Sequence, residues 1–156
     1  MAPPESENTM SPAASTEANI AVVRRFVDEV VNGGDLDTID ELWADDMIWR
    51  GGSLGEHHGI DAYKNFMAAN AVGAFTGMRL DVIQVVAQGD TVVLLFTNSG
   101  THTGAFMGTA PTGRHARWLG TAVYRIKDHK IAEATFAEDI LGMLFQLGIT
   151  TLPSAA

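Results

Sequence analysis

Four polar residues in the second half of the chain have side chains that can move a proton or hold a developing charge: Asn98, His102, Glu138 and Asp139. Asn98 and His102 share parity in an expected strand, so both side chains point to the same face of a sheet. A carboxyl group such as that of Glu138 has a raised pKa when apolar surroundings disfavour its charged form. Such a group is a useful acid or base near neutral pH. These four residues are therefore the candidate catalytic residues.

Each of the four residues also has a simpler structural interpretation. An isolated histidine is weak evidence for catalysis, so His102 can instead satisfy backbone groups at the end of a strand. Asp139 precedes an apolar helical run and can serve only as its N-cap. Glu138 can be solvated if the strand ends before it, and Asn98, if buried, must hydrogen-bond either backbone or a ligand.

The adjacent histidines His57 and His58 are the most suggestive metal-like pair. A metal site needs three or more converging ligands, and neighbouring side chains in sequence seldom bind one ion together. We expect no metal and no cofactor. The loop that contains these histidines is instead expected at the entrance of a cavity, where His57 can touch a ligand. Glycines in the segment 103–114 fit no nucleotide-binding spacing and indicate a mobile flap over that cavity.

Helices are predicted in the first half of the chain. Apolar residues at three- and four-residue spacing predict an amphipathic helix that Ser15 or Thr16 begins and Asn32-Gly33-Gly34 ends. A shorter helix is expected at 37–43, an extended piece at 47–50, and a glycine-containing loop up to residue 59. The third helix, 60–70, presents four apolar or aromatic residues inward: Ile60, Tyr63, Phe66 and Met67.

The second half of the chain changes to the pattern of a sheet. Segments rich in β-branched and aromatic residues predict four long antiparallel strands at 78–88, 90–103, 114–127 and 130–138. The run Val92–Phe96 is apolar without alternation, which favours a strand covered on both sides, by helices on one and by a second subunit on the other. A short helix follows at 140–147.

Composition limits the classes of function. The chain has 156 residues, 46% of them hydrophobic and none of them cysteine, so it can bury a core but cannot perform thiol chemistry. Its net charge of −9 repels nucleic acid and anionic membranes. We find no secretory signal or membrane-spanning run and expect a cytoplasmic protein. Residues 1–15 are predicted as a disordered tail, 16–149 as one domain and 150–156 as a C-terminal tail.

Several segments of the last third carry a resemblance to a known family. They are Gly100-Thr-His-Thr-Gly104, Pro111-Thr-Gly-Arg114, Tyr124-Arg-Ile126 with Lys130-Ile131, and Asp139-Ile-Leu-Gly-Met-Leu-Phe-Gln-Leu-Gly148. In this order and spacing, they resemble the SnoaL-like polyketide cyclases of the nuclear transport factor 2-like superfamily, over residues 18–148. The resemblance implies an α+β fold, a cone-shaped barrel in which N-terminal helices pack on a curved antiparallel sheet and enclose an apolar pocket. It also implies a homodimer that pairs through its sheets.

The resemblance does not extend to the catalytic residues of the cyclases. Their catalytic aspartate falls at Phe136 of this chain, and their paired Gln and His fall near Gly120 and Ala122. The chain therefore resembles the family in the segments named above but lacks its acid/base residues. Glu138 shares parity with Phe136, so it is expected to face inward near the mouth of the cavity.

The implied function is that of a polyketide cyclase of specialised, antibiotic-type metabolism, acting on a hydrophobic polyketide-like substrate. Without the family aspartate, preorganisation or a cycloaddition fits better than enolate aldol chemistry. A non-catalytic ligand-binding protein and an epoxide hydrolase or ketosteroid-isomerase-like enzyme are the alternatives. The residues expected to bind the substrate are Trp49, His57, Phe66, Phe96, Trp118, Tyr124 and Phe136.

Overall fold

The first helix begins earlier than the sequence predicts. The computed structural model describes residues 12–151 and 153, and α1 (Pro12–Arg25) continues directly into a π-helical segment, Phe26–Val31. A proline fits the first turn of a helix, and the alanines that follow it favour helix, so the helix extends into the predicted 1–15 tail. The rest of that predicted tail lies outside the described residues. The apolar stripe of this helix is buried and its charged face is largely exposed, as predicted.

The predicted second helix is shorter, and the strand that follows it is longer. A 3-10 turn (Leu36–Thr38) and α2 (Ile39–Leu42) lead into β1 (Trp43–Arg50), so the predicted helix end at Trp43 is wrong. Trp43 is fully buried and pairs with β6, which favours the extended conformation there. The predicted glycine loop contains a 3-10 turn (Gly52–Leu54) and a short strand, β2 (Glu56–His58), which pairs with β1.

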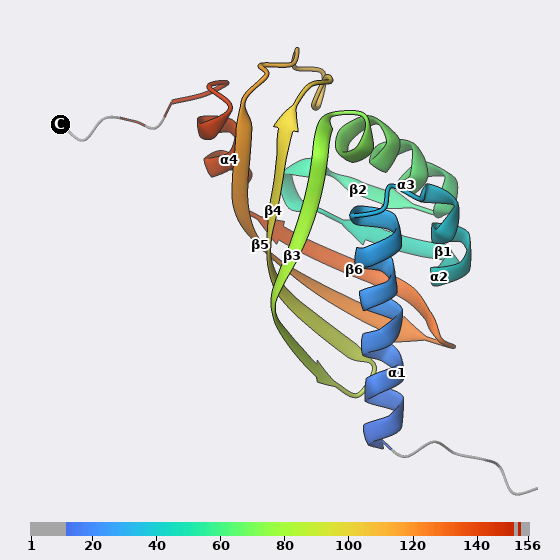
Figure 1. Cartoon of the computed structure of the whole chain (residues 1–156). Helices are drawn as coiled ribbons and strands as arrows, with labels where there is room; N and C mark the ends of the chain where they lie inside the picture. The colour runs from blue at the N-terminus through green and yellow to red at the C-terminus, as the bar shows by residue number, and fades with distance from the viewer. Residues whose placement is uncertain (1–11, 152, 154–156) are drawn as a thin grey trace, which may run out of the picture.

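The remaining elements form a helix and four long strands. After α3 (Ile60–Met67) and its π-helical end (Ala68–Val72), the sheet is completed by β3 (Phe75–Gln88), β4 (Thr91–His102), β5 (His115–Lys127) and β6 (Lys130–Glu138). The six strands lie in the order β2-β1-β6-β5-β4-β3, antiparallel except for the β1–β6 pair. Figure 1 shows the curved, unclosed sheet with α1, α2 and α3 on one side. The predicted α+β cone is confirmed.

Burial alternates along the long strands, and this alternation defines two faces of the sheet. Inward residues of β4 and β5 are buried, while the outward residues of β5 are mostly exposed. Within one chain the run Val92–Phe96 also alternates, since Val93 and Leu95 on the outer face are only half-buried. The core therefore lies between the inner face of the sheet and the helices.

The last helix closes one end of this core. Asp139 caps α4 (Ile140–Gln146), because its side chain accepts a hydrogen bond from the backbone N–H of Gly142. At the other end of α4, the Gln146 amide accepts from the N–H of Arg117 and donates to its carbonyl, both at 2.8 Å. Gln146 thus pairs with β5 where β6 has already ended. No helix in the described part of the chain has the length and apolar run needed to cross a membrane.

Candidate active-site pocket

A pocket lies between the inner face of the sheet and the helical layer. The space within it, including solvent outside its open mouth, is about 590 Å³, and its walls come from both helical and strand elements. Most of the lining side chains are apolar or aromatic. The exceptions with a carboxyl or amide group are Asn70, Asn98 and Glu138. An apolar chamber with a few placed polar groups is the usual form of a small-molecule site.

Glu138 is the carboxyl group of this pocket, and two donors hold it. Its Oε1 atom accepts a hydrogen bond of 2.7 Å from Asn98 Nδ2 and another of 2.9 Å from the indole Nε1 of Trp118. Asn98 and Trp118 are direct partners in the β4–β5 ladder, so the sheet itself fixes the distance between the donors. Because both hydrogen bonds end on Oε1, Oε2 is left to interact with a ligand.

The position of Glu138 depends on a glycine. Gly120 of β5 lies opposite Glu138, and an added Cβ there would come within 2.6 Å of the Phe96 ring and 3.0 Å of Glu138 Cγ. Such contacts are too short for a side chain to occupy. The absence of a side chain at Gly120 therefore leaves room for the Glu138 side chain to reach Trp118 on β5 and, across that strand, Asn98 on β4.

Burial governs the chemistry of this carboxyl group. Desolvation raises the pKa of Glu138, and the hydrogen bonds from Trp118 and Asn98 lower it by less. Burial also raises the pKa of Tyr63 well above its usual value, and that of Tyr124 in the same direction, so both phenols stay protonated. Glu138 is thus the carboxyl group of this wall, and its protonated form persists to higher pH than that of an exposed glutamate.

Six of the predicted site residues line the pocket together. Asn98, Trp118 and Glu138 form its polar wall, and the apolar walls include Trp49, Phe66 and Phe136. Trp49 packs against both Phe66 and Phe136, with ring centroids 5.0 and 5.5 Å apart. Phe136 faces inward, as the alternation predicts.

Two of the four predicted catalytic residues do not line this pocket, which corrects their assignment as catalytic residues. His102 is fully buried, and its Nδ1 accepts from the backbone N–H of Thr112 at 3.1 Å, so it fastens the 103–114 loop to the end of β4. Asp139 is exposed and caps α4. Both residues have the structural roles that their sequence positions also indicated.

Three predicted substrate-binding residues lie behind the pocket wall. Phe96 and Tyr124 are completely buried and pack on Phe136, with ring centroids 5.9 and 5.6 Å away, so Phe136 separates them from the cavity. His57 stacks on Phe66 with ring centroids 4.2 Å apart. These residues support the lining residues rather than forming the surface of the pocket.

Some lining residues were not predicted from sequence as part of the pocket. Phe106 comes from the 103–114 loop and reaches the pocket beside Phe75, with ring centroids 5.6 Å apart. Met143 reaches it from α4. The pair Phe106-Met107 between Gly104 and Gly108 is the sequence signal for the first of these, because apolar side chains in a glycine-rich loop need a surface to cover.

The described residues do not form a recognisable metal centre. No group of three or more His, Asp or Glu side chains in this part of the chain is arranged to hold an ion. His58 Nε2 instead contacts Glu56 Oε1 at 2.7 Å on the surface.

The family of the chain follows from comparison with known proteins. The family model of the SnoaL-like polyketide cyclases matches residues 21–147. The chain belongs to this family, as the resemblance in the sequence implied. No curated protein sequence matches the chain significantly.

Solved structures share the fold over most of the chain. A candidate SnoaL-like polyketide cyclase from Jannaschia sp. CCS1 has a TM-score of 0.81 at 22% identity, covering 92% of this chain and 99% of that chain. AclR, a candidate hydroxylase from Streptomyces galilaeus, has a TM-score of 0.74 at 28% identity, covering 90% and 86%. IdmH, a candidate polyketide cyclase from Streptomyces antibioticus, has a TM-score of 0.68 at 29% identity, covering 83% and 98%.

Proposed function

We propose that the protein is a cofactor-independent polyketide cyclase of specialised, antibiotic-type metabolism. It closes a ring in a polyketide-derived chain that the apolar pocket holds in a folded shape. The observation that carries the proposal is the partly buried carboxyl group of Glu138, held by Trp118 and Asn98 on the polar wall of a largely apolar pocket. Family membership supports the same class of reaction.

Folding of the substrate supplies one part of the proposed mechanism. Aromatic walls that include Trp49, Phe66 and Phe136 favour a compact apolar chain over an extended one in water. Bringing two ends of one molecule together in a reactive geometry can remove about 7–11 kcal/mol from the barrier in favourable cases. The pocket therefore favours ring closure even without a strong base.

Proton exchange by Glu138 supplies the other part. Because burial raises the pKa of this carboxyl group, its protonated form persists to higher pH than in water. A protonated carboxyl group can donate from Oε2 to a substrate carbonyl oxygen and polarise it, and the ionised form can take up a proton from the adjacent carbon. The resemblance in the sequence implies that the aspartate of the related cyclases falls at Phe136, and we propose that Glu138 acts from a position two residues further along the same face.

The test uses two synthetic linear substrates that cyclise by different reactions. An aldol closure of a β-triketone thioester moves a proton from carbon to the new alkoxide, and loss of water then lowers the product mass. An intramolecular cycloaddition of a triene with a tethered alkene leaves the mass unchanged. Mass spectrometry with chromatography distinguishes the two products from unreacted chains, and Glu138→Gln is compared with the original protein.

We expect conversion of at least one substrate. Loss of about a hundredfold or more in the rate with Glu138→Gln identifies proton exchange, and loss of only a few-fold identifies folding of the substrate as the main contribution. Binding of both chains with quantitative recovery of unreacted material would contradict the cyclase proposal and favour a ligand carrier.

The protein is also proposed to act as a homodimer that pairs through the outer face of its sheet. The support is a set of apolar side chains on that face, since Leu119 and Val123 of β5 are 51% and 45% exposed, and Val123 lies directly beside Val93 of β4. Exposed apolar side chains that gather on one face are typical of interfaces.

A further inference from the structure

The side-chain amide of Asn98 uses one of its two polar atoms and leaves the other unpaired. Its Nδ2 donates to Glu138 Oε1, as described above, whereas Oδ1 is buried and makes no hydrogen bond within the described part of the chain. Asn98 is only 5% exposed and lines the pocket. A buried amide oxygen without a partner is unusual in a folded protein and calls for an explanation.

Neighbouring groups fix the orientation of this amide. The indole N–H of Trp118 can only donate, and it donates to the same Glu138 oxygen that faces Asn98. Oε1 accepts both when the carboxyl group is ionised and when its proton is on Oε2, so the amide presents its NH₂ group to Glu138. The backbone of Asn98 is paired on both sides, with Leu80 of β3 and Trp118 of β5. Oδ1 is therefore held in place as an acceptor.

An acceptor held in this way discriminates between ligands. A ligand O–H or N–H group that donates to Oδ1 satisfies it, whereas a ligand atom with only lone pairs leaves it unpaired and meets its partial negative charge. The carboxyl group of Glu138 contacts the amide at Nδ2 and makes no hydrogen bond with Oδ1. A ligand is therefore left to supply the donor.

We propose that Asn98 is a specificity-determining residue whose Oδ1 accepts a hydrogen bond from a hydroxyl or enol O–H of the substrate. The pocket then selects polyketide-derived chains that carry such a donor close to the carbonyl group that Glu138 polarises. The inference rests on the proposed function, since it takes this pocket as the substrate site. It adds the chemistry by which one polyketide-like chain is preferred over another.

The test compares two probes of similar size. 2-Naphthol carries a hydroxyl donor, and 2-fluoronaphthalene replaces it with a fluorine that cannot donate. Their dissociation constants are measured by quenching of tryptophan fluorescence, because Trp49 and Trp118 line the pocket. The ratio of the two constants is compared between proteins, so differences in hydrophobicity between the probes cancel.

Variants of Asn98 are then compared with a control variant on the outer face of the sheet. Asn98→Leu should shift the ratio toward 2-fluoronaphthalene by roughly tenfold, the upper range for one net hydrogen bond. Thr121→Ala, on the exposed outer face of β5, leaves the pocket wall unchanged, so its ratio should stay within about twofold of the original. Asn98→Ala repeats the measurement should Asn98→Leu fail to fold, and circular dichroism with thermal melting checks the fold of each.

Other results overturn the inference. An unchanged ratio in the Asn98 variants, a ratio shifted as far in Thr121→Ala as in the Asn98 variants, or no binding of either probe to the original protein would each do so. The ratio does not depend on turnover, so the two proposals fail separately. A shifted ratio without cyclisation of any linear substrate contradicts the proposed function alone, and cyclisation with an unshifted ratio contradicts this inference alone.

Discussion

The carboxyl group of Glu138 lies where its ionisation is costly. Burial raises its pKa, and the two hydrogen bonds to Oε1 offset only part of this effect. A group whose pKa is raised in the folded protein contributes stability below its ordinary pKa range, and this contribution is lost as the pH rises through the folded-state pKa. The same feature that suits Glu138 for proton exchange therefore reduces stability at neutral and basic pH.

Replacement of the Glu138 carboxyl group should increase the stability of the variant relative to the original protein as the pH rises. Glutamine cannot ionise, so Glu138→Gln should gain stability relative to the original protein as the pH rises above the ordinary range of a glutamate. Urea unfolding at several pH values measures the difference. Glu17→Gln on the exposed side of α1 is the control. A difference that stays constant, or that falls as the pH rises, would contradict burial as the dominant cause.

A side chain at position 120 should disturb the packing around the Glu138 side chain. In Gly120→Ala the new methyl would press on the buried Phe96 ring and on Glu138 Cγ. Overpacking of this kind costs about 1–3 kcal/mol. We expect a lower melting temperature and weaker quenching by 2-naphthol, while Thr121→Ala on the outer face changes neither greatly. Normal stability and binding in Gly120→Ala would show that Glu138 does not need the gap.

Strand alternation was enough to predict the faces of these residues but not their depth. Asn98 and Trp118 were correctly assigned to the inner face, and so was Glu138. His102 shares that face, yet it lies at the end of β4, where it fastens a loop instead of lining the pocket. Tyr124 is inward as well but lies behind Phe136. Alternation along a strand predicts which face of the sheet a side chain lies on. The position along the strand and the size of neighbouring rings decide whether that side chain reaches the pocket.

At the scale of the elements, the 103–114 loop forms part of the pocket wall. Phe106 is 5% exposed and contacts Phe75, so the loop contributes an apolar side chain to the pocket. The next residue, Met107, donates its backbone N–H to Asn70 Oδ1 at 2.8 Å, which joins the loop to the helical layer. This hydrogen bond holds the loop against the opposite wall.

Removal of this link should speed the exchange of ligands. Asn70→Ala loses a hydrogen bond of about 0.5–1.5 kcal/mol, so the loop should open roughly two to twelve times more often. Association and dissociation of 2-naphthol should both accelerate, with a smaller change in affinity, as measured by stopped-flow fluorescence. Asn65→Ala on the exposed side of α3 is the matched control. Unchanged rates would show that the loop does not limit entry.

Element boundaries were less predictable than element types. The sequence indicated the helices and the four long strands, because their apolar spacing is local. It missed the extension of β1 back to Trp43 and the presence of β2, since both depend on pairing between distant segments. The parallel pairing of β1 with β6 is equally non-local and has no signature in either segment.

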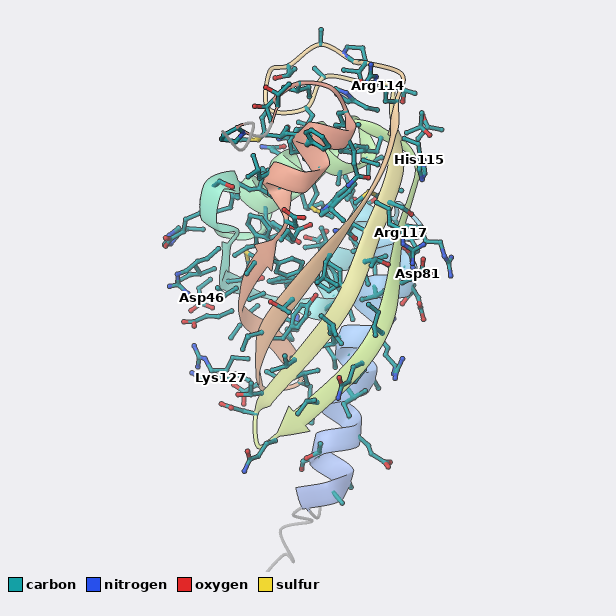
Figure 2. All side chains as sticks on the ribbon, turned by 90° about the vertical axis from the view of Figure 1, so that its left-hand side faces the viewer. Asp46, Asp81, Arg114, His115, Arg117 and Lys127 are labelled. Atoms are coloured by element: carbon teal, nitrogen blue, oxygen red, sulfur yellow. The ribbon has the colours of Figure 1, made fainter. Side chains whose placement is uncertain are left out.

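At the scale of the whole molecule, the outer face of the sheet carries exposed apolar side chains on neighbouring strands. Figure 2 labels charged residues on this side of the molecule, among them Asp46, Arg117 and Lys127, and Arg117 lies on the outer face of β5 itself. Across the middle of the face, Val93 lies between Val86 of β3 and Val123 of β5. A chain with a net charge of −9 repels its own copies, so a stable dimer requires a surface of this neutral, apolar kind.

A charge in the middle of this face should separate the proposed dimer. A two-fold interface places each substitution in both copies, so Val123→Lys would introduce two like charges into a desolvated surface. Val72→Lys is the matched control, because Val72 and Val123 are both 45% exposed but Val72 lies on the helical layer. Sedimentation equilibrium should show a dimer for the original protein and for Val72→Lys, and a dissociation constant raised by roughly tenfold or more for Val123→Lys. A monomeric original protein, or equal dissociation constants for the two variants, would contradict pairing through the sheet.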